Sequence, residues 1–265
     1  MLKKLLKYDL KWVYKVIVVF YGLAIIFSIF ARMFNSIDNS LLFKVIGNIC
    51  SSVAIAMLVS SLINTLMRSW VRFVRNIYKD ESYLTHTLPV EKKTIYLSKV
   101  LSAVISSFTT ILVIAICLFI CYYSKENIIT LKNMLDIAAT AYNTTVINLI
   151  LIISVILFLE LLFILLVGYV GIIIGHRSNK SKMTKSIVYG FISYMVSTIG
   201  MLLMIYIAGL FNADIMNLIK TTNEININSI KIVLYFVIVL YTIYVIILYI
   251  IGKKQLEEGV NVDWY

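Results

Sequence analysis

The chain has 265 residues, of which 61% are hydrophobic and 14% are charged. Soluble domains contain roughly 45–50% apolar and about 25% charged residues, so the composition excludes an ordinary soluble domain. The formal net charge is +11, from 24 Lys and Arg against 13 Asp and Glu. In a soluble protein such an excess would suggest nucleic-acid binding, whereas in an apolar chain the cations are expected in the loops on one side of a membrane.

Long apolar stretches follow one another along the chain. A helix needs about 20 apolar residues to cross about 30 Å of hydrocarbon, and six stretches meet this requirement. They lie at about residues 16–31, 45–67, 100–123, 146–175, 187–211 and 232–252. None alternates like a strand of a membrane barrel, which leaves helices as the spanning elements. We predict an all-α polytopic membrane protein whose residues 1–265 form a single transmembrane domain.

The cations between these spans are distributed unequally. With the N-terminus inside, the inner segments hold 18 Lys and Arg residues and the outer segments hold six. The positive-inside rule therefore places both termini in the cytoplasm. Lys, Ile and Asn are abundant, which is typical of AT-rich bacterial genomes, so the expected location is a bacterial cytoplasmic membrane. The surplus of positive charge lies on the cytoplasmic face, and we expect no nucleic acid as a partner.

The first fifteen residues predict an amphipathic helix. Its apolar side is formed by Leu2, Leu5, Leu6, Leu10 and Val13, and its basic side by Lys3, Lys7 and Lys11. Such a helix would lie in the cytoplasmic interface of the membrane. A helix that only keeps the first span from slipping is an equally good interpretation.

The segment between the second and third spans, residues 68–99, is more informative. The second span is expected to continue as a helix with one basic stripe, formed by Arg68, Arg72, Arg75 and Lys79. Asp80 is predicted to cap a short helix, and Glu81 suits the positive end of its dipole. This helix must end before Pro89, which forces Leu88 out of the helical region.

Pro89 itself is predicted to open the next helix, which runs through Lys99 into the third span. The result is a short amphipathic crosspiece between two stiff helices, and it carries Tyr83, Leu84 and Leu88. A cytoplasmic partner that pushed on such a crosspiece would act on two spans at once.

Two segments carry a resemblance to a known family. They are the opening Met1-Leu-Lys-Lys-Leu-Leu-Lys-Tyr-Asp and the stretch Tyr78-Lys-Asp-Glu-Ser-Tyr-Leu-Thr-His-Thr-Leu-Pro-Val, followed by Ser98-Lys99. They resemble the permease subunits of type-2 ABC exporters, in particular the small six-span permeases of Gram-positive bacteria. That family has an acidic turn, then Tyr-Leu, then Leu-Pro-Val before a helix that ends in Ser-Lys.

The resemblance implies a dimer of permeases, either a homodimer or a pair with a related paralogue, bound to two cytoplasmic ATPase subunits. It also implies short helices between the fifth and sixth spans and a coupling helix within residues 80–88. The residues assigned to ATPase coupling are Arg72, Arg75, Lys79, Asp80, Glu81, Tyr83, Leu84, Leu88 and Pro89. The family exports peptides, lipids or drug-like amphipathic substrates, including antimicrobial peptides, and some members give immunity to them.

This chain has no G-x-x-x-x-G-K-[ST] phosphate loop. We therefore expect no cofactor or metal in it and no catalytic activity of its own, with ATP and Mg bound by the partner ATPase. Two alternatives remain: a non-ATP secondary transporter or membrane signalling subunit, and an intramembrane protease. The protease needs buried acids and histidines, but the predicted spans offer only Glu160, while His86 and His176 fall outside them.

Glu160 lies near the middle of the fourth span. A carboxylate there costs about 2.5–3.5 kcal/mol on the insertion scale, so it should face protein or water. One interpretation is a polar site for a cationic peptide or a proton. The other is a neutral or hydrogen-bonded Glu160 that pairs with polar residues of the second span, such as Asn48, Ser52 or Asn64.

Overall fold

The structure, a computed structural model, describes residues 1–37, 40–219 and 227–261. Within these ranges the chain is helical and contains no strand. The helices belong to two compact units, Met1–Thr130 and Leu131–Asp263. Each unit is described by itself below.

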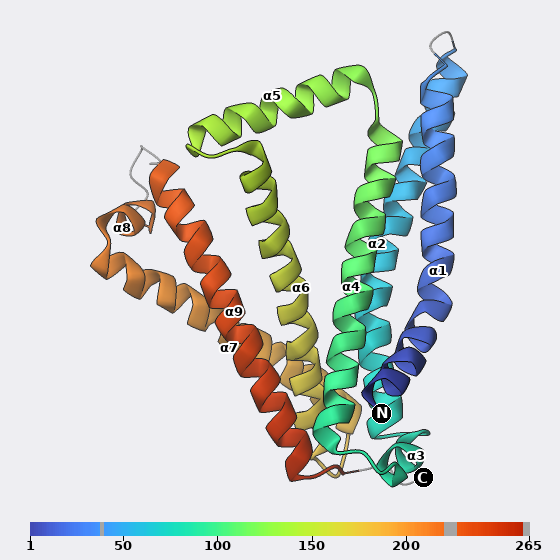
Figure 1. The fold of residues 1–265 in the computed structure, drawn as a ribbon, viewed down its shortest axis with the longest axis vertical. Coiled ribbons are helices and arrows are strands. Elements are labelled where there is room, and N and C mark those ends of the chain that lie inside the picture. Colours follow the sequence, from blue (N-terminus) through green and yellow to red (C-terminus); the bar gives the residue numbers. More distant parts are fainter. Residues whose placement is uncertain (38–39, 220–226, 262–265) are drawn as a thin grey trace. The chain divides into compact units, whose positions relative to one another are not determined.

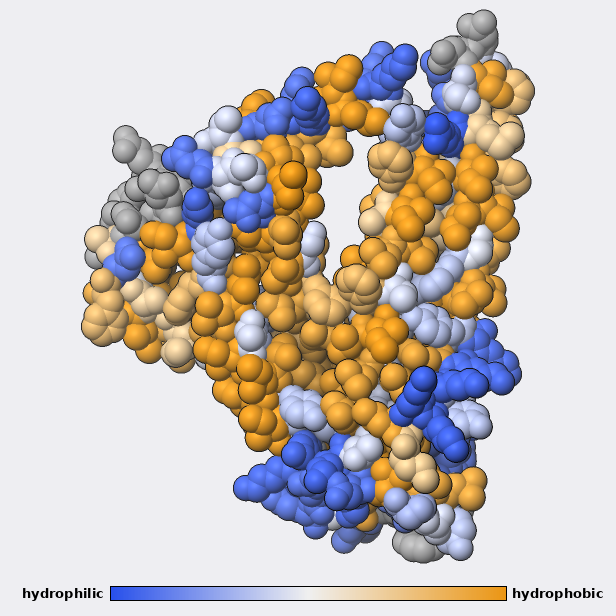
Figure 2. All heavy atoms as spheres, viewed as in Figure 1, coloured by the Kyte–Doolittle hydropathy of each residue, from blue (hydrophilic) through white to orange (hydrophobic). Residues whose placement is uncertain are grey.

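Long helices account for most of the chain (Figure 1). The spanning helices are α1 (Leu2–Asn35), α2 (Leu41–Ile77), α4 (Lys92–Tyr122), α6 (Val146–His176), α7 (Lys182–Phe211) and α9 (Ile227–Glu258). All six are long and apolar enough to cross a membrane, which confirms the predicted multi-pass membrane class. Figure 2 shows hydrophobic residues along the middle of these helices and hydrophilic residues gathered at their ends.

The first unit is built on the packing of α1, α2 and α4 against one another. Two of its buried clusters contain small side chains, such as Ala24 and Cys117 beside Leu58. Hydroxyl groups between the helices bond to each other: Tyr21 Oη lies 2.6 Å from Thr110 Oγ1, which lies 2.9 Å from Thr65 Oγ1. Small side chains allow close helix packing in membranes, and the hydrogen bonds satisfy polar groups that lipid could not.

In the second unit, α6 packs against both α7 and α9. Phe163 of α6 is the centre of an aromatic cluster, with ring centroids 5.7–6.3 Å from those of Tyr194, Tyr241 and Tyr244. Tilted and edge-on ring pairs at such distances are favourable beyond the area they bury. The cluster therefore ties all three long helices of this unit together.

Two shorter helices lie in the segments predicted to be outside. The sequence analysis did not predict α5 (Lys125–Ala141), which follows α4. Ser124 starts it, because its hydroxyl accepts a hydrogen bond from the backbone N–H of Asn127, and Glu126 sits in the first turn. α8 (Ala213–Ile219) lies where the resemblance implies short helices, and residues 220–226 of that segment are outside the described ranges.

Candidate docking segment and its buried ionic support

A short helix, α3 (Ser82–Thr87), lies between α2 and α4, where the sequence predicts a crosspiece. It packs against α2. Residues 80–88 are called the candidate docking segment below. Thr85 faces inward and its hydroxyl donates to the carbonyl of Glu81 at 2.9 Å, while a ring nitrogen of His86 lies 3.0 Å from the carbonyl oxygen of Ile77. The first bond is internal to the start of α3, and the second holds α3 against the end of α2.

The other side of α3 presents apolar side chains. Tyr83 is 76% exposed and Leu84 is 67% exposed, and Leu88, just after the helix, is also exposed. Large apolar residues exposed together on an otherwise polar segment mark a surface for contact with another molecule. Three of the predicted docking residues, Tyr83, Leu84 and Leu88, are therefore accessible, whereas Arg72 of the same set is buried.

The predicted cap of this helix is wrong. The N-cap is Glu81, and it makes no side-chain cap hydrogen bond. Asp80 instead accepts a hydrogen bond from Arg75, with 3.1 Å between Oδ2 and Nη2. A cationic side chain competes with a helix N–H for the carboxylate, and here the guanidinium of Arg75 is the donor that binds it. This pair is exposed at both ends, so its contribution to stability is small.

The predicted start of α4 at Pro89 is also wrong, because α4 begins at Lys92. Leu88 is extended (ψ 137°), as expected before proline, but Glu91 is extended too (ψ 140°). The N–H of Val90 donates to the carbonyl of Leu88 at 2.7 Å, a tight turn that is incompatible with a helix starting at Pro89. Residues 88–91 thus form a short non-helical link between α3 and α4.

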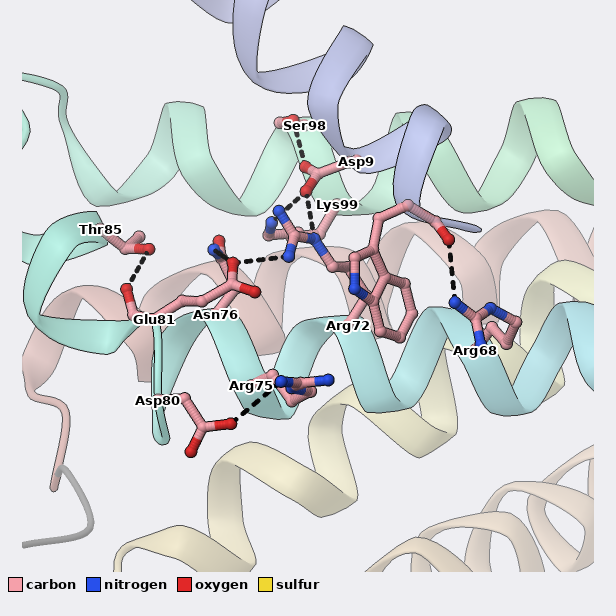
Figure 3. A network of polar contacts seen from close by, with 11 residues as sticks. Asp9, Arg68, Arg72, Arg75, Asn76, Asp80, Glu81, Thr85, Ser98 and Lys99 are labelled. Atoms are coloured by element: carbon pink, nitrogen blue, oxygen red, sulfur yellow. Dashed lines mark hydrogen bonds and ion pairs between the residues drawn. The ribbon is translucent and has the colours of Figure 1, made fainter. Parts of the chain in front are cut away.

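A buried carboxylate, that of Asp9, is linked to the docking segment through Arg72 (Figure 3). Asp9 of α1 is 1% exposed and contacts two other helices. Its Oδ1 accepts hydrogen bonds from Arg72 Nε of α2 at 2.9 Å and from Lys99 Nζ of α4 at 2.5 Å. Its Oδ2 accepts a hydrogen bond from the hydroxyl of Ser98 at 2.9 Å. One side chain therefore joins α1, α2 and α4 at the end of the unit that carries the docking segment.

The contacts continue from Arg72 to the docking segment. Arg72 Nη1 donates to Glu81 Oε2 at 2.6 Å, and the amide of Asn76 donates to the same oxygen at 3.0 Å. Asp9, Arg72, Glu81 and Lys99 are called the ionic cluster below. It contains two acids and two bases, so its formal charge is zero. Such a balance is what makes buried charges tolerable, since each one alone would cost several kcal/mol to remove from water.

A second contact fixes α1 against α2 beside the ionic cluster. The guanidinium of Arg68 lies 4.0 Å from the centre of the Trp12 ring, and its Nη2 donates to the Trp12 carbonyl at 2.9 Å. A cation over an indole face is attracted by the negative face of the ring. The predicted basic stripe is thus divided: Arg68 and Arg72 bind α1, whereas Arg75 is directed to Asp80 (Figure 3).

The sequence analysis missed Asp9, Asn76 and Lys99 as site residues. For Asp9 a signal existed, because it lies four residues after Leu5 and four before Val13, on the apolar side of the predicted helix. A lone carboxylate at such a position indicates a buried partner. The partners are Arg72 and Lys99, which lie 63 and 90 positions from Asp9 in the sequence, so the packing of the helices is needed to identify them.

The other predicted site residues lie elsewhere. Glu160 is part of α6 in the second unit and is partly buried, one turn before Phe163. Ser52 and Asn64 of α2, predicted as its partners, donate to backbone carbonyls one turn earlier in their own helix. His176 is buried, with Nδ1 3.0 Å from the hydroxyl of Ser186. Across the described residues, no three His, Cys, Asp or Glu side chains gather as a metal site requires.

Comparison with known proteins gives no identification. No protein-family model, no curated protein and no solved structure matches the chain. The function must therefore be inferred from the docking segment and its support.

Proposed function

We propose that the chain is the membrane permease subunit of an ATP-driven ABC exporter, and that its docking segment binds a cytoplasmic ATPase subunit. One observation carries this proposal: Tyr83 and Leu84 are exposed on a short helix whose base is held by a partly buried ion pair to Arg72, which itself is bound to Asp9 by a buried one. An exposed apolar contact on a rigid base is suited to transmitting force. The sequence resemblance described above supports the same function.

In this mechanism the exposed residues and the supporting residues have different roles. Tyr83, Leu84 and Leu88 contact the ATPase, and the charged rim around them is formed by Arg75, Lys79 and Asp80. Arg72 and Glu81 are turned inward and transmit the movement to α2. Pro89 keeps the link to α4 extended, so that a displacement of α3 also reaches α4.

The other subunits and the location of the transporter follow from this role. ATP and Mg are held by the ATPase chain, and a second permease subunit completes the transport path. The protein lies in a bacterial cytoplasmic membrane with both termini in the cytoplasm, and the basic side of residues 2–15 faces lipid headgroups there. The substrate class is an amphipathic peptide, lipid or drug-like molecule, such as an antimicrobial peptide.

Co-expression with the ATPase whose gene we expect beside this one tests the proposal. The wild-type chain is expected to copurify with the ATPase, and Tyr83→Ala combined with Leu84→Ala is expected to weaken that association at least about tenfold, because buried apolar anchors carry most of the energy of an interface. The thermal stability of the isolated chain should change little, since both side chains are exposed.

Lys93→Ala is the matched control. Lys93 is exposed, belongs to the same inner segment and forms an exposed ion pair with Glu91 outside the docking contacts, so its removal should leave copurification unchanged. If the wild-type chain does not bind the ATPase, or if the double variant binds as well as wild type, the proposal is wrong. Transport that continues without nucleotide would favour the secondary transporter instead.

A further inference from the structure

We infer that Asp9 is a positioning residue for the docking segment, and that the start of α1 thereby belongs to the coupling apparatus. The assigned coupling residues all lie between Arg72 and Pro89, far from Asp9 in sequence. The inference rests on the proposed function for its last step, the effect on ATPase coupling. Its first step, the orientation of α3 by Asp9, concerns this chain alone.

The geometry of Arg72 carries the first step. Its guanidinium donates from Nε to Asp9 and from Nη1 to Glu81, at 2.9 Å and 2.6 Å. These two nitrogens belong to one planar, rigid group, so fixing one of them fixes the direction of the other. Asp9 therefore orients Arg72, and Arg72 orients Glu81, whose backbone begins α3.

Lys99 and Ser98 hold Asp9 itself. They bind its two carboxylate oxygens from α4, at 2.5 Å and 2.9 Å. With Arg72 bound from α2, the carboxylate has a fixed position relative to two helices. The docking segment is attached to the same two helices at its ends. Asp9 therefore fixes the position of Arg72, and through it that of α3, relative to α2 and α4.

Stability alone is a poor explanation for this arrangement. Replacing a buried ion pair by apolar residues of similar volume is often neutral or stabilising, so such pairs are weak determinants of stability. The neighbouring positions on the same side of α1, Leu5 and Val13, are apolar. A further apolar residue at position 9 would continue that side, but it could not orient the guanidinium of Arg72.

Spin labelling of α3 tests the first step in the purified full chain, reconstituted in lipid nanodiscs without any partner. The label is placed through Thr87→Cys, an exposed position of α3 outside the docking contacts, after Cys50, Cys117 and Cys121 are replaced by Ala. Asp9→Asn keeps the size of the side chain and removes its charge. We expect loss of the immobilised spectral component, and partial recovery of it in Asp9→Glu.

Two further variants separate positioning from folding. Asp9→Asn with Lys99→Met removes one charge of each sign, so the remaining Arg72 and Glu81 are balanced and the chain should fold. The label should still be mobile, because Nε of Arg72 has lost its charged carboxylate acceptor and faces only a neutral amide, which holds it more weakly. Arg177→Gln, which breaks an exposed pair with Glu258 in the other unit, should leave the label as in wild type. An immobilised label in a folded Asp9→Asn chain or in the double variant would overturn the inference.

The last step is measured in the complex with the ATPase. Asp9→Asn is expected to copurify with the ATPase, because Tyr83 and Leu84 remain exposed, but to lose substrate-stimulated ATP hydrolysis, with recovery in Asp9→Glu. Loss of copurification together with hydrolysis would contradict a positioning role. If the wild-type chain bound no ATPase, the proposed function would fail, while the label measurement would still decide the role of Asp9.

Discussion

Arg72→Met is expected to lower the free energy of unfolding by about 3–5 kcal/mol, the range found when one partner of a buried ion pair is removed. Arg72 is buried and binds both acids of the ionic cluster. Without it Asp9, Glu81 and Lys99 carry a net charge of −1, and the shared donor between α1 and the docking segment is gone. The loss should appear as a lower Tm of the detergent-solubilised chain, followed by tryptophan fluorescence.

Arg75→Met is the control for this experiment. Arg75 lies three residues further along α2 and also binds an acid, Asp80, but both side chains are about half exposed. Exposed pairs contribute about 0–1 kcal/mol, so the Tm of this variant should stay close to that of wild type. Equal losses in the two variants would show that the burial of Arg72 contributes nothing, contrary to the structure.

Gly171→Ala is expected to destabilise the second unit by about 1–3 kcal/mol, the usual effect of adding a methyl group to a closely packed core. A Cβ atom at position 171 of α6 would lie 2.5 Å from Cα and N of Gly190 in α7. Because the obstacle is backbone, no side chain can turn away, and the two helices must separate. The readout is again the Tm of the detergent-solubilised chain.

Gly190→Ala provides a control on the other side of the same contact. A Cβ atom at position 190 meets no atom within 4 Å, so the added methyl group has space. Since alanine favours a helix over glycine by about 0.8–1.0 kcal/mol, this variant should be as stable as wild type or more stable. A loss of stability in Gly190→Ala as large as in Gly171→Ala would contradict the close crossing of α6 and α7.

The spanning helices could be predicted from sequence because each is defined by a local property, a run of apolar residues long enough for the membrane. The helices extend beyond these apolar runs. The apolar run of the second span stops near residue 67, yet α2 continues to Ile77, where its basic side chains bind α1 and the docking segment. The sequence predicted this extension, but not the contacts made by the basic stripe.

The candidate site was predictable only where local rules decide the outcome. The short helix and the extended Leu88 follow from neighbouring residues and from proline geometry. The cap by Asp80 and the start of α4 at Pro89 failed because Arg75 and the turn at residues 88–90 offered competing bonds. The ionic cluster could not be predicted at all, since it requires α1, α2 and α4 to be packed first. The orientation of the termini and the identity of the partners stay predictions.

The members of the ionic cluster lie far apart in the sequence, so they are synthesised at different times. Asp9 is synthesised long before Arg72 and Lys99, so its carboxylate has no cationic partner in this cluster while the first helices are being inserted. The support behind α3 can be completed only after α4 has entered the membrane. A chain arrested before that stage would expose a docking segment without its support. Under the proposed function, a subunit that bound its ATPase before that stage would be poorly coupled.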